Sequence, residues 1–147
     1  MGSRTMAKVL IADDDTELLA NVALHLRNEE YTVVCAADGF EALAAARRED
    51  PDLLLVTVGL MVDEDSSLCD ELHEHPALRR IPIVYMVGER AVRLGNVPKV
   101  PARSMIFKPV HTDELFRKIG LAVSGVNKCR RDVRPARGDD VRHERAA

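Results

Sequence analysis

The sequence lacks any stretch that is long and apolar enough to cross a bilayer. Its longest apolar-looking run, residues 53–62, contains Thr57 and Gly59 and is far too short to span one. It also lacks a basic-then-apolar signal peptide at its start, and residues 1–5 are interpreted as an N-terminal arm or tag. We therefore expect a cytoplasmic protein that makes no contact with a membrane.

The cysteine residues give no indication of metal binding or of disulfide cross-linking. Cys35, Cys69 and Cys129 are odd in number, widely spaced, and form neither a CxxC pair nor a Cys/His ligand pattern. In a reducing compartment such residues are free thiols, so the sequence implies neither a disulfide nor a zinc site. What remains is an ordinary composition, with 46% hydrophobic and 31% charged residues, of a size that suits one domain.

The charge is unevenly distributed along the chain. The net charge is −3, yet residues 126–147 contain seven lysine or arginine residues against four acids. This segment contains Pro135 and Gly138 and has almost no apolar periodicity. We therefore predict that residues 125–147 form a disordered basic tail outside the folded domain, too short to be a DNA-binding domain of its own.

Apolar segments alternate with helix-forming segments along residues 6–124. After the first apolar segment, for example, Leu18, Leu19, Val22 and Leu26 recur at helical spacing. The five segments with the composition of buried parallel strands are residues 8–13, 31–37, 52–58, 82–87 and 104–107. Strand–helix alternation repeated five times predicts an α/β domain with a doubly wound parallel sheet.

One segment departs from this alternation. Residues 89–103 should contain the fourth helix, but they include Gly95, Pro98 and Pro101. A proline inside a helix costs roughly 3 kcal/mol. We therefore predict that the fourth helix is short or irregular and ends near Leu94.

Charged residues gather where the chemistry of such a sheet takes place, at the carboxyl ends of the strands. Asp13 and Asp14 end the first strand, and Lys108 follows the fifth. Two carboxylates can hold Mg²⁺, and a lysine can neutralise a phosphoryl oxygen. The residues alone leave two interpretations open, a metal and phosphate site or a charged cluster without a ligand.

Four segments, in order along the chain, resemble the receiver domain of response regulators in two-component signalling. They are residues 9–15 (VLIADDD), 37–43 (ADGFEAL) and 51–56 (PDLLLV), followed by the dipeptide at 108–109. The resemblance covers residues 6–124 and implies a flavodoxin-like sheet with the strand order 2-1-3-4-5.

The same resemblance assigns roles to individual residues. It implies that Asp13 and Asp14 are the family's metal-binding acidic pair, that Lys108 is its invariant lysine, and that the Lys108–Pro109 bond is cis. A working receiver also needs an aspartate nucleophile at the end of the third strand. The matched position is Thr57, a neutral alcohol that is weakly nucleophilic without a neighbouring base.

Two other positions of the family's switch also differ. Val87 stands where a hydroxyl residue normally ends the fourth strand, and Met105 stands where an aromatic residue is expected. The remaining pocket, made by Asp13, Asp14, Thr57 and Lys108, has two interpretations. Asp13, Asp14 and the backbone carbonyl of Gly59 could bind Mg²⁺ weakly, or Lys108 could pair directly with one of the two aspartates. We favour the salt-bridged pocket, for which no cofactor is required.

These departures lead us to predict a pseudo-receiver. It is a non-enzymatic signalling module that recognises a protein partner without phosphorylation at the usual position, with no role for nucleic acid and with a homodimer possible. One alternative is a phosphorylatable response regulator that uses Asp63 or Asp65 as a displaced acceptor. A remote alternative is a phosphatase, because residues 13–16 (DDDT) resemble the DxDx[T/V] strand of haloacid-dehalogenase-type hydrolases, although Glu17 occupies the Thr or Val position.

Overall fold

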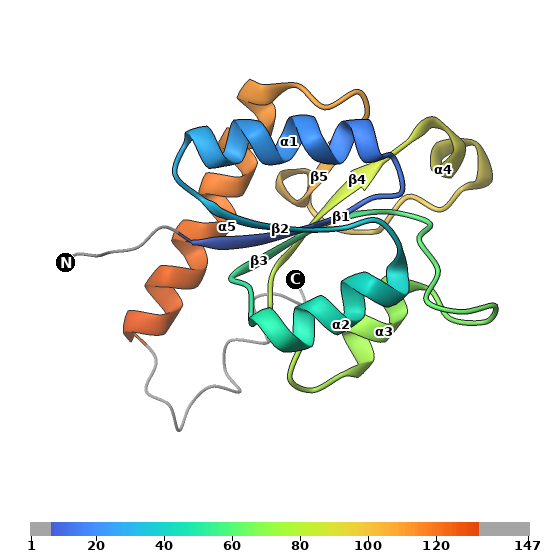
Figure 1. Cartoon of the computed structure of the whole chain (residues 1–147), viewed down its shortest axis with the longest axis horizontal. Helices are drawn as coiled ribbons and strands as arrows, with labels where there is room; N and C mark the ends of the chain where they lie inside the picture. Colours follow the sequence, from blue (N-terminus) through green and yellow to red (C-terminus); the bar gives the residue numbers. More distant parts are fainter. Residues whose placement is uncertain (1–6, 133–147) are drawn as a thin grey trace.

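The computed structural model describes residues 7–132 and shows an α/β fold built on one five-stranded sheet (Figure 1). Its strands are β1 (Lys8–Ala12), β2 (Thr32–Ala36), β3 (Leu53–Thr57), β4 (Ile83–Val87) and β5 (Met105–Phe107). Their order is β2-β1-β3-β4-β5, and every neighbouring pair is parallel. The predicted fold and strand order are confirmed, and each strand lies inside the segment predicted for it.

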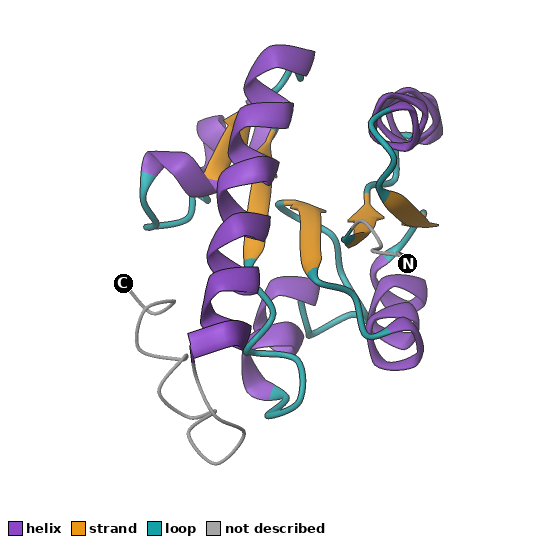
Figure 2. Cartoon of the chain, turned by 90° about the vertical axis from the view of Figure 1, so that its left-hand side faces the viewer, coloured by secondary structure: helices purple, strands orange, loops and turns teal. Residues whose placement is uncertain are grey.

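Helices cover both faces of this sheet (Figures 1 and 2). They are α1 (Thr16–Asn28), α2 (Gly39–Glu49), α3 (Leu68–Glu74), α4 (Glu89–Leu94) and α5 (Thr112–Asp132), with a short 3-10 turn η1 (Ala102–Ser104) before β5. The apolar faces of α1 and α5 pack on one side of the sheet, and those of α2 and α3 pack on the other.

The core follows from the alternation of side chains along the strands. Val9 and Ile11 of β1 point into the cluster between the sheet and helices α1 and α5. Leu10 and Ala12 point into the cluster between the sheet and helices α2 and α3. The central strand β3 is buried along its whole length, because helices cover both of its faces.

The fourth helix is as short as its sequence predicts. It has six residues and ends at Leu94, followed by the cap Gly95, whose φ of 75° is a left-handed conformation that glycine adopts without steric cost. A third apolar cluster, which includes Tyr85, Val87 and Ala91, lies between this helix and β4. A helix of six residues is too short to be stable alone, so α4 is stabilised by the packing of its apolar side chains on β4.

The last helix extends beyond the predicted domain boundary. Residues 125–132, predicted to be disordered, belong to α5, which ends at Asp132. The sequence offers a reason, because no proline interrupts the chain before Pro135 and a formed helix propagates easily through residues such as lysine and arginine. The predicted arm at residues 1–5 and the rest of the predicted tail lie outside the described residues.

Side-chain caps set the positions at which the first helices begin. Asp15 Oδ1 accepts hydrogen bonds from the backbone N–H groups of Glu17 and Leu18, both at 3.1 Å, and so begins α1 directly after the acidic pair. Asp38 Oδ1 accepts from Glu41 N at 2.7 Å, while Glu41 Oε1 accepts from Ala37 N at 2.9 Å. These two hydrogen bonds resemble a capping box, with Ala37 rather than the N-cap residue as the second donor, and they fix the start of α2 at the carboxyl ends of the strands.

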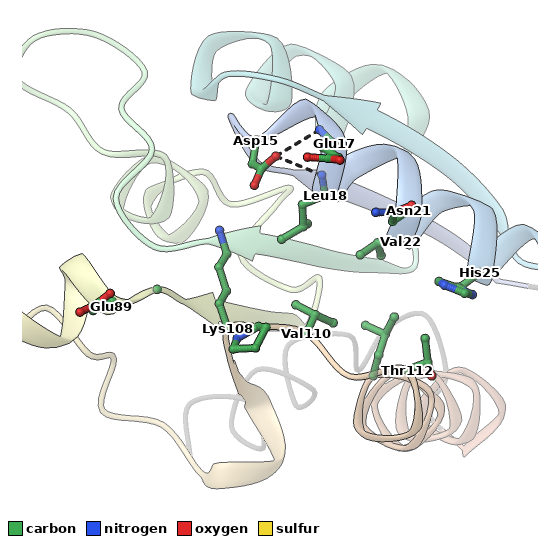
Figure 3. A pocket seen from close by; sticks show the side chains of 13 residues that line it. Asp15, Glu17, Leu18, Asn21, Val22, His25, Glu89, Lys108, Val110 and Thr112 are labelled. Atoms are coloured by element: carbon green, nitrogen blue, oxygen red, sulfur yellow. Dashed lines mark hydrogen bonds between the residues drawn. The ribbon is translucent and has the colours of Figure 1, made fainter.

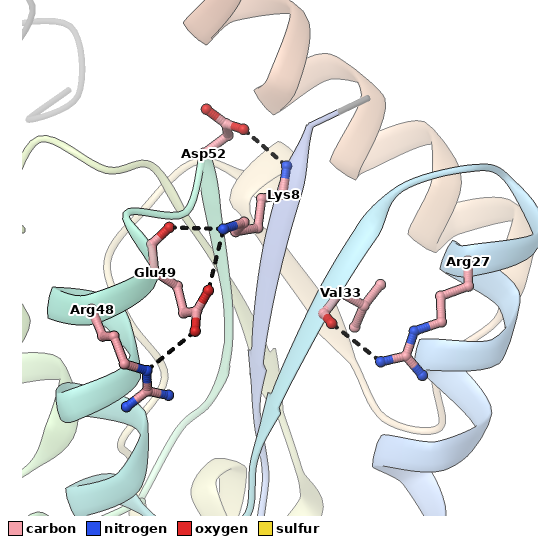
Figure 4. Close-up of polar contacts among 6 residues, drawn as sticks. All are labelled: Lys8, Arg27, Val33, Arg48, Glu49 and Asp52. Atoms are coloured by element: carbon pink, nitrogen blue, oxygen red, sulfur yellow. Dashed lines mark hydrogen bonds and ion pairs between the residues drawn. The ribbon is translucent and has the colours of Figure 1, made fainter. Parts of the chain in front are cut away.

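Polar contacts also connect the elements at the amino ends of the strands (Figure 4). Lys8 donates from its backbone N–H to Asp52 Oδ2 at 2.8 Å and from Nζ to the Glu49 backbone oxygen at 3.1 Å. Arg48 Nε lies 3.1 Å from Glu49 Oε2. These contacts join the end of α2 to the starts of β1 and β3.

Within residues 7–132, the helices are all too short or too polar to cross a membrane.

Candidate functional site

Asp13 follows directly after β1 and is completely buried. Its backbone N–H donates to the Ala36 carbonyl at 3.1 Å, and its Oδ1 accepts from the backbone N–H of Asp15 at 2.9 Å. The apolar strand carries the carboxylate to the end of the sheet, and the turn into α1 holds it there. Asp13 is therefore positioned by the pairing of β1 with β2 and by the turn into α1, before Lys108 contributes.

Lys108 reaches this carboxylate from the other side of the site. Its backbone N–H donates to the Val87 carbonyl at 2.9 Å, which places it directly after β5. Its Nζ lies 2.7 Å from Asp13 Oδ2. Within the described part of the chain, Oδ2 has no hydrogen-bond partner besides this ion pair. The ammonium charge thus compensates the buried carboxylate, and the predicted ion pair is present.

Asp14, the neighbouring acid, is exposed, and within residues 7–124 it takes part in no ion pair. Gly59 follows β3 in a left-handed conformation with φ of 107° and is also exposed. Of the two aspartates that the sequence offers to Lys108, the structure pairs it with Asp13.

Thr57 ends the central strand β3 and is 6% exposed. Its hydroxyl donates to the Met86 carbonyl on β4 at 3.4 Å, a long contact for a hydroxyl donor. No carboxylate or imidazole in the described range of residues is hydrogen-bonded to this hydroxyl to act as a base. Its chemistry is therefore that of a buried structural alcohol rather than of an activated nucleophile.

The two remaining switch positions lie in apolar surroundings. Val87 is buried at the end of β4, in the same cluster as Tyr85, and Met105 at the start of β5 packs against that cluster. The Tyr85 hydroxyl lies 3.1 Å from His73 Nε2, and burial raises the pKa of Tyr85. The Lys108–Pro109 bond is cis, as the family resemblance implies.

Asp63 and Asp65 lie in the exposed loop between β3 and α3. Asp63 Oδ1 accepts hydrogen bonds from the backbone N–H groups of Asp65 and Ser66, both at 2.9 Å. The Asp63 carboxylate thus stabilises its own loop. Of the residues that the structure describes, only Asp13 forms an ion pair with Lys108.

The described residues fit a divalent cation poorly. In residues 7–124 no group of three His, Cys, Asp or Glu side chains is arranged to hold a metal ion. Both oxygens of Asp13 are already engaged, one by the Asp15 backbone N–H and one by the Lys108 ammonium. Thr57 contributes no charge. Mg²⁺ would have to displace the ammonium and rely on two carboxylates.

Sequence reasoning missed a groove of about 740 Å³ that opens beside Lys108 (Figure 3). Its walls come from α1, from the start of α4, from the segment between β5 and α5, and from the first turn of α5. Polar lining side chains include Asp15, Asn21, His25, Glu89 and Lys108. These residues are scattered along the chain, so no local pattern in the sequence marks the groove.

The family model described as the response regulator receiver domain matches residues 9–120. The response regulator PleD of Caulobacter vibrioides is 32% identical over 118 residues, which cover 77% of this chain and 25% of PleD. TcrX of Mycobacterium tuberculosis is 38% identical over 88 residues, or 57% of this chain and 35% of TcrX. The chain thus spans about a quarter to a third of these relatives.

Solved structures agree with the fold. A response regulator receiver domain protein from Methanospirillum hungatei, described as CheY-like, superposes with a TM-score of 0.67 at 27% identity. The match covers 84% of this chain and 98% of that one. The chemotaxis response regulator CheY4 of Vibrio cholerae has a TM-score of 0.65 at 24% identity, a likeness of fold alone. The match covers 80% of this chain and 99% of CheY4.

Proposed function

Because this chain belongs to the response regulator receiver domain family, we propose that it is a receiver that signals by binding a protein without being phosphorylated at the usual position. The observation that carries the proposal is Thr57, a buried alcohol at the tip of the central strand, where a receiver needs a carboxylate. The family match favours this interpretation over a haloacid-dehalogenase-type phosphatase. A cytoplasmic location and a homodimer remain predictions.

The chemistry of phosphoryl transfer supports the proposal. An aspartyl-phosphate forms when a carboxylate oxygen attacks phosphorus, and an alcohol can replace it only if a base removes its proton. The Thr57 hydroxyl instead donates to the Met86 carbonyl. Asp13, the buried carboxylate of this site, is engaged by the Lys108 ammonium, so it is not available as that base.

The switch that would read a phosphoryl group also lacks its polar part. In a phosphorylated site a hydroxyl at the end of β4 would donate to the new oxygens, but Val87 has no donor and is buried among apolar side chains. Met105, at the start of β5, packs against the same cluster. The α4 region is therefore held by apolar packing that needs no phosphate.

The proposal is tested with a small phosphodonor and a phosphate mimic. The wild-type chain, incubated with Mg²⁺ and acetyl phosphate, is expected to gain no phosphate by intact mass. Its amide NMR spectrum is expected to be unchanged by Mg²⁺ and beryllofluoride. A Thr57→Asp variant supplies the missing carboxylate, and Thr57→Val, which removes the hydroxyl at nearly constant volume, is the matched control.

The outcomes separate the explanations. A response of Thr57→Asp alone identifies the acceptor as the missing part, and silence of all three proteins means that Val87 and Met105 also prevent switching. Phosphate on wild-type Asp63 or Asp65, lost in Asp63→Asn or Asp65→Asn, would establish a displaced acceptor and overturn the proposal. Phosphate on Thr57 would overturn it as well.

A further inference from the structure

We propose that the chain docks a basic, amphipathic segment of a partner protein on one defined face, the Phe40–Met61 surface. This surface consists of two exposed apolar side chains and five exposed acids in the same two segments of the chain, namely Phe40, Met61, Asp38, Glu41, Asp63, Glu64 and Asp65. The inference rests on the proposed function in one respect, that the chain acts by binding a protein, and it adds the chemistry of that protein.

The two apolar side chains belong to segments whose backbones touch. Phe40 is 70% exposed in the first turn of α2, and Met61 is 47% exposed in the loop after β3. An added Cβ on Gly39 would lie 2.4 Å from the Met61 carbonyl oxygen, so the start of α2 lies directly against this loop. Leu60 and Val62, on either side of Met61, pack into the cluster between the sheet and helices α2 and α3, and so hold the loop in place.

Three of the five acids are held in position before any partner arrives. Asp38 and Glu41 each accept a backbone hydrogen bond at the start of α2, and Asp63 accepts two hydrogen bonds from its own loop. Neither residues 36–41 nor residues 59–67 contain a lysine or arginine. Carboxylates that are already fixed lose little conformational entropy on binding.

The charge of this surface selects among binding partners. Nucleic acids and anionic lipids are repelled by clustered carboxylates, because both are negatively charged. A segment that covers Phe40 and Met61 must bring apolar side chains for the centre and cations for the rim, as complementary interfaces do. Exposed Leu24 and Leu121 lie singly on α1 and α5 and need no such explanation.

The test is an NMR titration of the full chain with a synthetic amphipathic peptide of lysine and leucine, without any phosphodonor. The amides of residues 38–41 and 61–65 and the Met61 methyl group are expected to shift, and added salt should weaken the binding. A peptide of glutamate and leucine with the same pattern is expected to leave them unchanged. Shifts centred on the groove beside Lys108, or equal binding of both peptides, would overturn the inference, as would preferential binding of phosphatidylserine vesicles.

Variants separate this surface from the rest of the chain. Phe40→Ala is expected to weaken peptide binding about tenfold or more, as removal of a central aromatic anchor does. Leu121→Ala, which removes an exposed apolar side chain from α5, should have no effect. If Leu121→Ala weakens binding as much as Phe40→Ala, the surface is misassigned. Phosphorylation of the wild type with peptide bound here would overturn only the proposed function, and binding elsewhere without phosphorylation would overturn only this inference.

Discussion

The Lys108 ammonium and the Asp13 carboxylate lie 2.7 Å apart, although β3 and β4 separate their strands in the sheet. The Asp13 side chain is 0% exposed and that of Lys108 is 24% exposed. A carboxylate buried this deeply requires a compensating charge, and Lys108 supplies it from the far edge of the sheet. The pair therefore ties the loop after β5 to the end of β1.

Replacing Lys108 with methionine should lower the free energy of unfolding by roughly 3 kcal/mol, because the Asp13 carboxylate would remain buried without a counter-charge. Urea denaturation near neutral pH measures the change. The control is the same replacement in the Asp13→Asn background, where the buried charge is already absent and the loss should be much smaller. Equal losses in both backgrounds would mean that the ion pair does not account for the effect.

Gly39→Ala should destabilise the chain by about 1–3 kcal/mol, because the new methyl group would overlap the Met61 carbonyl oxygen and push the loop away from α2. Gly120→Ala is the matched control within α5, where a Cβ meets open space, and it should stabilise the helix by up to about 1 kcal/mol. Urea denaturation of both variants gives the comparison. A neutral Gly39→Ala would show that the loop yields easily.

Glu49 should titrate below the usual range of a glutamate. The hydrogen bonds from Arg48 and then Lys8 lower the pKa of this carboxyl, because both favour its charged form (Figure 4). Because the pKa is lowered in the folded protein, the stabilisation from these contacts is complete above pH 4.5 and is lost as the pH falls through the lowered pKa. NMR titration of the side-chain carboxyl measures this, and Arg48→Gln should move the midpoint back toward 4.5. An unchanged midpoint in Arg48→Gln would contradict the assignment.

Cys69 should react slowly with thiol reagents in the folded protein. Burial, and then the nearby Asp70 charge, raise its pKa from 9.0 to about 11, so the reactive thiolate is scarce at about pH 8. A variant with Cys35→Ser and Cys129→Ser leaves Cys69 as the sole thiol for alkylation. The pKa of the Cys69 thiol is higher in the folded protein than in the unfolded chain. The stability linked to this thiol is therefore complete below pH 9.0 and is lost as the pH rises through about 11. Rapid labelling of the folded variant at about pH 8 would contradict the prediction.

Local sequence patterns predicted the elements of this fold well. The five strands were recognisable because apolar runs such as residues 53–57 had to be buried on both faces, and the short α4 was recognisable from Gly95 and the prolines beyond it. The structure extends α5 to Asp132, beyond the predicted boundary of the domain, because the polar residues 125–132 contain no proline that would stop a helix. Composition describes what a segment can bury, and it does not decide how far a helix extends.

The amino-acid sequence specifies which chemical groups are available: an alcohol at residue 57, a valine at 87, and carboxylates at 13 and 14 opposite one lysine. How these groups are used depends on the folded arrangement. It buried Asp13 against Lys108 and left Asp14 exposed, and it placed Phe40 beside the loop of Met61. The physical reason is that residue type fixes charge and reactivity, whereas burial and partnership depend on strands and loops that are distant in the chain and meet only when the sheet is assembled.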